Sequence, residues 1–308
     1  MLLSEYEAII ERHRSVRPLR LSIDVLIREF PHIPAHTLRS IISTDFTMMV
    51  RQNYYLYANP ERIAQYYDKY KSQRALGNSS PGFLLKIADD LNLSASLICR
   101  FVLESHLRDT GEVCSKRTLN QLLKDTWKIH DEVLAVEIFL CTLHDPFYGP
   151  FSDAKRASVG QEFELILKDT LRSRKIAFID ENALRKQGYD KTPDVKLEVP
   201  AIINGEFVIT WIESKASFGD PNSHKSYTHD QFHSYVNRFG PGLVIYWRGF
   251  VDELQLQDTN ISEEMSDSPA GQRFGSLGSE NDQRAAATRQ FLLVDRLPDD
   301  IRSMTEIV

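Results

Sequence analysis

The hydrophobic pattern of this 308-residue chain changes its period at residues 145–150, where Asp-Pro-Phe-Tyr-Gly-Pro interrupts it. Proline and glycine end regular elements, so the interruption predicts a boundary. Before it, apolar residues recur at the three- to four-residue spacing of helices; after it, two stretches alternate as half-buried strands do. A single all-helical or all-β domain is therefore excluded, and the chain is expected to be α/β with a helical N-terminal region.

The helical region, residues 1–150, is expected to contain two helix pairs. Ser22–Phe30 and Thr37–Phe46 each place apolar residues on one face. Pro81–Leu91 and Ala95–Leu107 form the second pair, with Ser94 placed to cap the later helix. Both pairs resemble helix-turn-helix modules, although an ordinary helical hairpin has the same pattern.

Other residues of this region suggest roles that the pattern leaves open. Arg100 and Arg108 lie on the second pair and could contact phosphates. The tyrosines between residues 54 and 70 could stack on bases, but their spacing favours packing on an amphipathic helix. A third helical stretch is expected from Ser115 to His144.

The region after the break is expected to have the element order α-β-β-β-α-β. The predicted elements are a helix over Gly160–Leu171, strands over Lys175–Ile179, Asp194–Pro200 and Phe207–Ser214, a helix over His229–Phe239 and a strand over Leu243–Trp247. We assign residues 151–254 to this domain. Residues 255–290 are polar, acidic and aperiodic and predict a disordered insertion. Residues 291–308 predict a final segment that docks on the domain.

Two acidic residues are brought together by the predicted strands. Asn204-Gly205 is a hairpin turn signal. Pairing across it can place Asp194 beside Glu213, and Lys215 shares the face of Glu213 because side chains alternate along a strand. Two carboxylates and one ammonium are therefore expected at one point of the sheet.

This group of residues suits hydrolysis assisted by a metal ion. Carboxylate oxygens bind Mg²⁺ and leave positions for water and phosphate oxygens. A lysine can stabilise charge that develops on the phosphate. Glu162 or Glu164 of the preceding helix could add a ligand, and Glu162 is favoured. A Glu-x-Lys strand end by itself is more often an inert surface ion pair.

Three blocks of sequence resemble a known family. Pro193-Asp194 with Glu213-Ser214-Lys215 resembles the PD-(D/E)xK nuclease signature, and Gln231-x-x-x-Tyr235 resembles the additional motif of its RecB-like branch. Residues 188–194, 211–220 and 238–247 resemble the codanin-interacting nuclease family, also described by its TPD motif. The resemblance covers roughly residues 1–254.

The resemblance implies a nuclease that uses Mg²⁺ or Mn²⁺, built on a PD-(D/E)xK restriction-endonuclease-like core. Asp194, Glu213 and Lys215 match the active-site motif, and Asp194 and Glu213, supported by Glu162, would bind the metal. Gln231 and Tyr235 carry over as further catalytic residues. The family also implies codanin as a partner, a nuclear and cytoplasmic location, and a link to histone handling and red-cell development.

Composition limits the other possibilities. The sequence contains no apolar run long enough for a transmembrane helix and no signal-peptide pattern, so a membrane role is not expected. Three widely spaced cysteines favour reduced thiols in an intracellular protein. The net charge of −6 comes mainly from residues 254–308, which hold 5 basic and 10 acidic residues. The near-neutral remainder does not predict a strong nucleic-acid surface.

Several weaker sites remain open. His224, His229 and His233 have spacing that suits zinc ligands but lack an evident third ligand. Lys225 and Arg238 could bind phosphate or belong to a solvated helix face. The apolar surroundings of Cys99 and Cys141 favour core packing over a nucleophilic role, as in many structures.

Three functional hypotheses follow from the sequence, in order of preference. The first is a metal-dependent nuclease, for which DNA is favoured over RNA as substrate. The second is a catalytically silent scaffold that binds codanin or nucleic acid. The third is a transcription-factor-like module that uses the helix pairs. A homodimer is allowed but not required.

Overall fold

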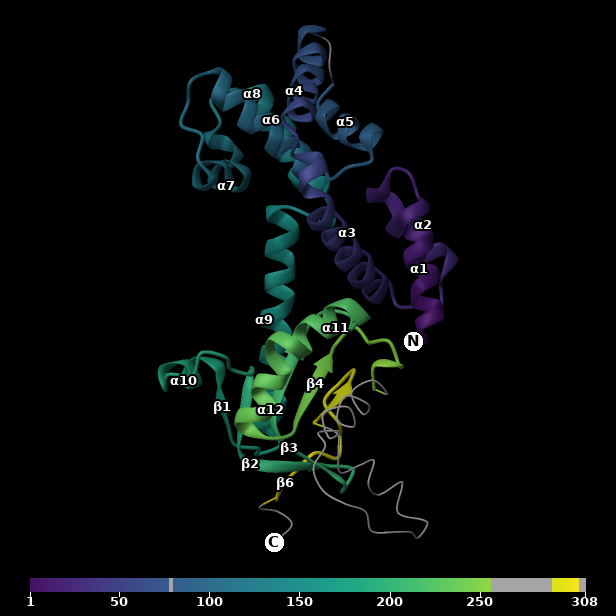
Figure 1. Ribbon diagram of the computed structural model, residues 1–308, viewed down its shortest axis with the longest axis vertical. Helices are drawn as coiled ribbons and strands as arrows, with labels where there is room; N and C mark the ends of the chain where they lie inside the picture. The colour runs from purple at the N-terminus through teal and green to yellow at the C-terminus, as the bar shows by residue number, and fades with distance from the viewer. Residues whose placement is uncertain (78–79, 256–289, 305–308) are drawn as a thin grey trace, which may run out of the picture. The chain divides into compact units, whose positions relative to one another are not determined.

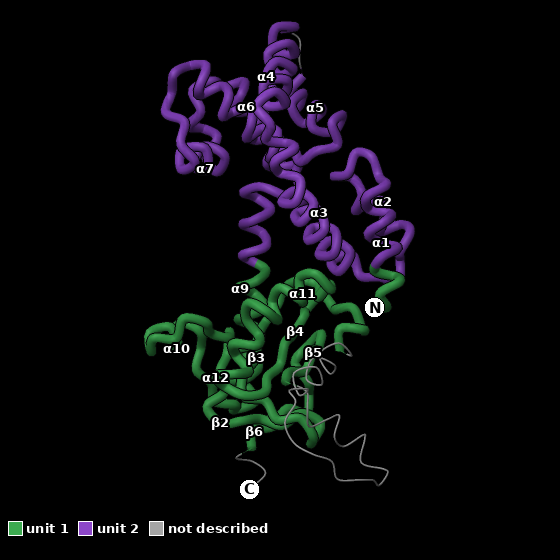
Figure 2. The backbone as a smooth tube through the Cα atoms, viewed as in Figure 1, with its two compact units in different colours: residues 1–6, 159–308 green, residues 7–158 purple. Residues whose placement is uncertain are grey.

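A computed structural model of the chain describes residues 1–77, 80–255 and 290–304. Residues 7–158 form one compact unit, and residues 1–6 with 159–308 form a second (Figure 2). The domain boundaries predicted from the sequence remain predictions, and nearly all of the predicted insertion at 255–290 lies outside the described residues. No described helix is long and apolar enough to cross a membrane.

The first unit is helical. Its elements are α1 (Leu3–Ser15), η1 (Leu19–Leu21), α2 (Ser22–Glu29), α3 (Ala35–Tyr57), α4 (Pro60–Ala75), α5 (Phe83–Leu91), α6 (Ala95–Asp109), α7 (Lys116–Lys124), η2 (Thr126–Lys128) and α8 (Glu132–His144), followed by α9 (Pro150–Ser173), which continues into the second unit. The helical N-terminal region expected from the sequence is confirmed.

The predicted cap between α5 and α6 is present. Asn92 ends α5 in the left-handed conformation, with φ of 53°. The Ser94 hydroxyl then accepts a hydrogen bond from the Leu97 amide at 3.1 Å, which satisfies one of the free amides at the start of α6.

The helical stretch expected from Ser115 to His144 is not continuous. The structure has α7, the short η2 and α8 in its place, with irregular backbone between them. Asp131 begins α8 as a cap, because its carboxylate accepts a hydrogen bond from the Leu134 amide at 3.2 Å. Leu119 and Leu123 of α7 and Ile129 after η2 are all buried, so the segment stays packed in the core although its helix is interrupted.

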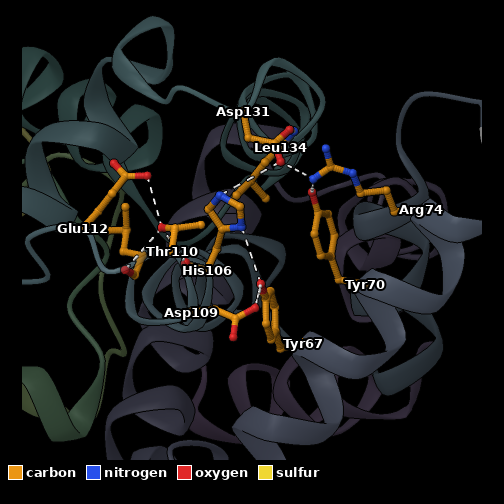
Figure 3. Close-up of polar contacts among 10 residues, drawn as sticks. Tyr67, Tyr70, Arg74, His106, Asp109, Thr110, Glu112, Asp131 and Leu134 are labelled. Atoms are coloured by element: carbon orange, nitrogen blue, oxygen red, sulfur yellow. Dashed lines mark hydrogen bonds and ion pairs between the residues drawn. The ribbon is translucent and has the colours of Figure 1, made fainter.

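The tyrosines of α4 pack inside the helical unit, as the sequence analysis favoured. Tyr66, Tyr67 and Tyr70 are buried. The Tyr67 hydroxyl donates to the Asp109 carboxylate at 3.1 Å, and Arg74 binds both the Tyr70 hydroxyl and Asp131 (Figure 3). Burial, with further contributions from nearby charges, raises the pKa of Tyr67 and of Tyr70 to about 12. These phenols stay protonated and serve as structural hydrogen-bonding groups.

The second unit is α/β. After α9 it contains β1 (Phe178–Asp180), α10 (Glu181–Lys186), β2 (Val195–Ile203), β3 (Phe207–Lys215), α11 (Pro221–Tyr227), the π-helical turn η3 (Thr228–Phe232), α12 (His233–Phe239), β4 (Gly242–Tyr246), β5 (Phe291–Val294) and β6 (Arg302–Ser303). The predicted order α-β-β-β-α-β is present, with α10, β5 and β6 added to it.

The strands form one mixed sheet in the order β1-β2-β3-β4-β5, with β6 paired to β2 (Figure 1). Strands β1, β2 and β3 are antiparallel neighbours, whereas β3, β4 and β5 are parallel. Asn204 and Gly205 form the β2–β3 turn with positive φ at both residues. Residues 291–294 form β5, which pairs with β4 in this sheet.

Helices cover both faces of this sheet. Leu167 and Leu171 of α9 are buried in the same apolar cluster as Ile212 of β3 and Leu243 of β4. On the opposite face, the indole of Trp211 packs against the rings of Phe232 and Tyr235. Ile166 of α9 is 41% exposed, because the helix turns its Leu167–Leu171 side to the sheet.

Candidate active site

The two acidic residues predicted to meet across the hairpin do lie side by side. Val195 of β2 pairs with Ile212 of β3, so Asp194 and Glu213 are the next positions in the register. The Asp194 amide donates to Glu213 Oε2 at 3.3 Å, and the Ser214 amide donates to Asp194 Oδ2 at 2.7 Å. Backbone amides of each strand thus hold the carboxylate of the other strand in place.

Lys215 joins this pair from the same strand face as Glu213. Its ammonium group lies 2.6 Å from Glu213 Oε1 and donates to the Gln231 amide oxygen at 2.8 Å. The same nitrogen lies 4.5 Å from the centre of the Tyr227 ring. The lysine is thereby fixed between β3 and the helical segment that follows it.

Burial sets the electrostatics of the three groups. It raises the pKa of Asp194 well above the ordinary value, and the charge of Glu213 adds to the effect. Burial also raises the pKa of Glu213, although the Lys215 ammonium opposes this. For Lys215, burial lowers the pKa, but the charges of Glu213 and Asp194 outweigh it and the net shift is upward. Ionisation of both carboxyl groups is therefore unfavourable, and the only compensating charge among the three groups is the Lys215 ammonium.

An open pocket of about 380 Å³ borders the carboxylates. Gln231 and Tyr235, the two residues carried over from the additional motif, both line it. The Tyr235 ring packs edge-on against Trp211 at a centroid distance of 5.3 Å. Burial, followed by the charges of Glu213 and Asp194, raises the pKa of Tyr235, so its phenol remains protonated beside the acids.

Of the two glutamates on α9, Glu164 is the one whose charge acts on Asp194. It raises the pKa of Asp194 after burial and Glu213, and it also lies 3.7 Å from Lys168. Glu162, which the sequence analysis favoured, is exposed and interacts electrostatically with Arg248.

A third carboxylate at the pocket was not anticipated from the sequence. Glu181 follows β1 directly, and its amide donates to the Asp194 carbonyl at 3.3 Å. Its carboxylate accepts from the Thr192 hydroxyl at 3.3 Å and pairs with Arg185 at 2.6 Å. The sequence does show an acidic residue just after a short predicted strand. To place that residue beside Asp194, however, one must know that β1 pairs with β2.

The donor set fits a hard divalent cation. Asp194 and Glu213 supply carboxylate oxygens, and their mutual repulsion would be relieved by a positive ion. Within the described ranges, no three His, Cys, Asp or Glu side chains lie close enough to hold a metal together. Mg²⁺ suits such a site, because it is commonly held by one or two carboxylates and completes its octahedron with water and phosphate oxygens.

The histidines of this unit do not form a zinc site in the structure. His224 is buried and its ring nitrogens face the hydroxyls of Tyr246, at 3.0 Å, and Thr228, at 3.4 Å. His229 is exposed and pairs with Asp230. His229 lies within the π-helical turn η3 and His233 begins α12, so their four-residue spacing does not correspond to one α-helical face.

The remaining candidates have ordinary surroundings. Arg238 pairs with Asp190 at 2.5 Å and donates to the Lys191 carbonyl. Lys225 is exposed on α11. Cys99 and Cys141 are fully buried in the helical unit, in agreement with a packing role.

Comparisons with known proteins place these residues in a family. The family described as "Protein of unknown function TPD sequence-motif" matches residues 130–266, which include Thr192-Pro193-Asp194. The chain is 43% identical to CDAN1-interacting nuclease 1 of Danio rerio over 255 residues, covering 82% of this chain and 84% of the relative.

Relatives from other vertebrates are similarly close. The identity to the protein of the same name from Homo sapiens is 41% over 252 residues, covering 82% of this chain and 89% of the relative. The identity to the Gallus gallus protein is 39% over 253 residues, covering 82% of this chain and 88% of the relative. No solved structure matches the chain. The chain therefore belongs to the CDAN1-interacting nuclease 1 family, whose TPD motif supplies Asp194 of the acidic pair.

Proposed function

We propose that this protein is a divalent-metal-dependent nuclease that hydrolyses phosphodiester bonds at the Asp194–Glu213–Lys215 site. One observation carries the proposal. The carboxyl groups of Asp194 and Glu213, whose ionisation is disfavoured by burial, border an open pocket and lie beside the Lys215 ammonium group. The names of the relatives, which include the word nuclease, support it. The α-β-β-β-α-β order, with Asp194 and Glu213 on adjacent strands, supports a PD-(D/E)xK core.

Each side chain has a defined task in this proposal. Asp194 and Glu213 bind Mg²⁺ or Mn²⁺, and Glu164 or Glu181 adds negative charge behind them. The bound ion would lower the pKa of a water molecule and neutralise charge on the phosphate. Lys215 orients the attacking water or stabilises the phosphate charge, since its pKa keeps it protonated.

Gln231 and Tyr235 act on the lysine and the pocket. Gln231 accepts a hydrogen bond from Lys215 and so limits the positions of the ammonium group. The protonated Tyr235 phenol lies in the pocket lining, where it can donate a hydrogen bond to a phosphate oxygen. Neither residue is charged, so both can position substrate without adding to the repulsion between the acids.

Partner and location are proposed from the relatives. Their names state an interaction with CDAN1, and we propose that this chain also binds codanin. We further propose DNA rather than RNA as substrate, a nuclear and cytoplasmic location, and a role connected with chromatin and red-cell differentiation. An assembly of two copies remains compatible with the proposal and is not needed for the site.

A cleavage panel tests the proposed activity. Labelled single strands, duplexes, flaps and four-way junctions of DNA and RNA are incubated with the protein and Mg²⁺, Mn²⁺ or EDTA. We expect metal-dependent cutting that Asp194→Asn or Lys215→Ala reduces by at least 100-fold, as removal of an electrostatic catalytic group typically does. Glu206→Gln is the matched control, because Glu206 is an exposed acid at the far end of the same hairpin.

The outcomes separate the two leading functions. Cutting that persists in Asp194→Asn would remove the site assignment. Absence of cutting on every substrate by a folded wild-type protein would favour the alternative, in which the nuclease fold is a scaffold that binds codanin or nucleic acid.

A further inference from the structure

Helix α7, residues Lys116–Lys124, presents an unusual exposed face in the helical unit. Leu119 and Leu123 bury its other side. The exposed positions follow one another at intervals of one and three residues along one side of the helix; they are Lys116, Arg117, Asn120, Gln121 and Lys124. This face therefore carries polar or charged side chains along the full length of the helix.

The charge of this face is positive and uncompensated. Helix α7 contains no acidic residue. Within the part of the chain that the structure describes, Lys116, Arg117 and Lys124 form no ion pair, whereas nearby Arg108 pairs with Glu104 and Lys128 pairs with Asp125. Cations that are neither paired nor buried remain available to an anionic ligand.

A fourth cation is held toward the same face. Arg100 of α6 donates to the Asn120 side-chain oxygen at 2.7 Å, so the guanidinium group lies beside α7. Four basic side chains thus gather at one helix of a protein whose net charge is −6. The neutral total of residues 1–150 concealed this local concentration, because the acidic residues lie on other elements.

Helix α6, to which the sequence analysis assigned phosphate contact, is poorly suited to that role. Its Arg108 is engaged by Glu104, and nine of its fifteen residues are buried, among them Leu97, Phe101 and Leu103. A helix must expose side chains along one face to enter a DNA groove. Helix α7 meets this requirement and α6 does not.

We propose that the exposed face of α7 is a binding site for double-stranded DNA, separate from the acidic pocket of the α/β unit. Nine residues at about 1.5 Å each give a helix of about 13.5 Å. The major groove of B-DNA, about 12 Å wide, accepts a helix of this kind. Lys116, Arg117 and Lys124 would contact phosphates, and Gln121 has the amide that pairs with adenine edges.

The chemistry favours duplex DNA over RNA. The major groove of A-form RNA is too deep and narrow for side chains to read, so a protruding helix gains little from it. The inference does not depend on catalysis, since the residues involved are not those of the Asp194 site.

The test measures binding by the full-length protein in EDTA, so that cutting cannot occur. Fluorescence anisotropy with a labelled 20-base-pair DNA duplex is recorded at several salt concentrations. The variant Lys116→Ala/Arg117→Ala/Lys124→Ala is compared with Arg39→Ala/Arg62→Ala/Lys69→Ala, which removes the same charge from exposed positions on α3 and α4. Circular dichroism confirms that both variants are folded.

We expect the α7 variant to lose at least tenfold in affinity, whereas the control loses less than threefold. The slope of log affinity against log salt should fall by about 3 in the α7 variant, about one per lost phosphate contact. A structured RNA hairpin should bind more weakly than the DNA duplex.

Three results would overturn the inference: no duplex binding by the wild type, equal losses in both variants, or binding of RNA as tight as that of DNA. Because cleavage is measured separately with the Asp194→Asn protein, failure of this site and failure of the proposed nuclease activity can be told apart.

Discussion

At the scale of single residues, the positions of Asp194 and Glu213 suit the binding of a cation. The same positions lower the stability of the fold when no cation is bound. Glu213 is buried, Asp194 is half-buried, and the Lys215 ammonium group lies 2.6 Å from Glu213. Since burial favours the protonated acids, deprotonation of either one weakens the fold. A bound cation would reverse this effect.

The variant Asp194→Asn should therefore raise the melting temperature by a few degrees in EDTA at neutral pH. Asparagine keeps an oxygen that can accept the Ser214 amide hydrogen bond but carries no charge. The raised pKa of Asp194 means that its contribution to stability is present below the ordinary pKa of 3.8 and is lost as the pH rises through the folded-state pKa.

Calorimetric melting as a function of pH checks this expectation. The difference between variant and wild type should grow as the pH rises above about 4, a value near the unperturbed aspartate pKa. Added Mg²⁺ should stabilise only the wild type. A variant that melts below the wild type at neutral pH would show that Asp194 is a net stabilising group.

The meeting of Asp194 and Glu213 could be predicted because it depends on local rules. Strand alternation and a two-residue turn with Asn-Gly determine which positions face each other. The position of Glu181 could not be predicted in the same way. It depends on the pairing of β1 with β2 across α10, a contact that the sequence pattern alone does not specify.

At the scale of elements, strong local signals predicted the type of each element better than its ends. The Ser94 cap and the β2–β3 hairpin are where the sequence indicates. The helix expected over His229–Phe239 begins earlier, at Pro221, and passes through a π-helical turn before α12. The π-helical turn places Gln231 within hydrogen-bonding distance of Lys215. It therefore reflects a contact between distant parts of the chain rather than the local preference of its own residues.

The close approach of β4 to β3 leads to a prediction about Gly242. A Cβ at this position would overlap the Trp211 indole, whose N–H is fixed by the Gly240 carbonyl at 2.8 Å. Gly242→Ala should destabilise the α/β unit by about 1–3 kcal/mol, the usual cost of overpacking. Urea unfolding followed by tryptophan fluorescence measures it.

Gly160→Ala is the control for this substitution. Gly160 lies within α9 and a Cβ there would meet no other atom within 4 Å. Alanine is the better helix former, so this variant should gain about 0.5–1 kcal/mol. Equal stability of the two variants would contradict the packing described for Trp211.

At the scale of the whole molecule, the two proposed activities lie in different units. The acidic pair belongs to the unit of residues 1–6 and 159–308, and α7 belongs to the unit of residues 7–158. The sequence predicted the change from helical to α/β structure because the hydrophobic period changes. It did not reveal the basic face of α7, since charge totals over 150 residues average out a cluster of four side chains.

We propose that Asp194 and Glu213 bind a catalytic metal ion. This is tested by titration of the full-length protein with Mn²⁺, in which free Mn²⁺ is counted by electron paramagnetic resonance. We predict one bound ion per chain for the wild type and for Glu206→Gln, and loss of that ion in Asp194→Asn and in Glu213→Gln. An unchanged number of bound ions in Asp194→Asn and Glu213→Gln would contradict the claim.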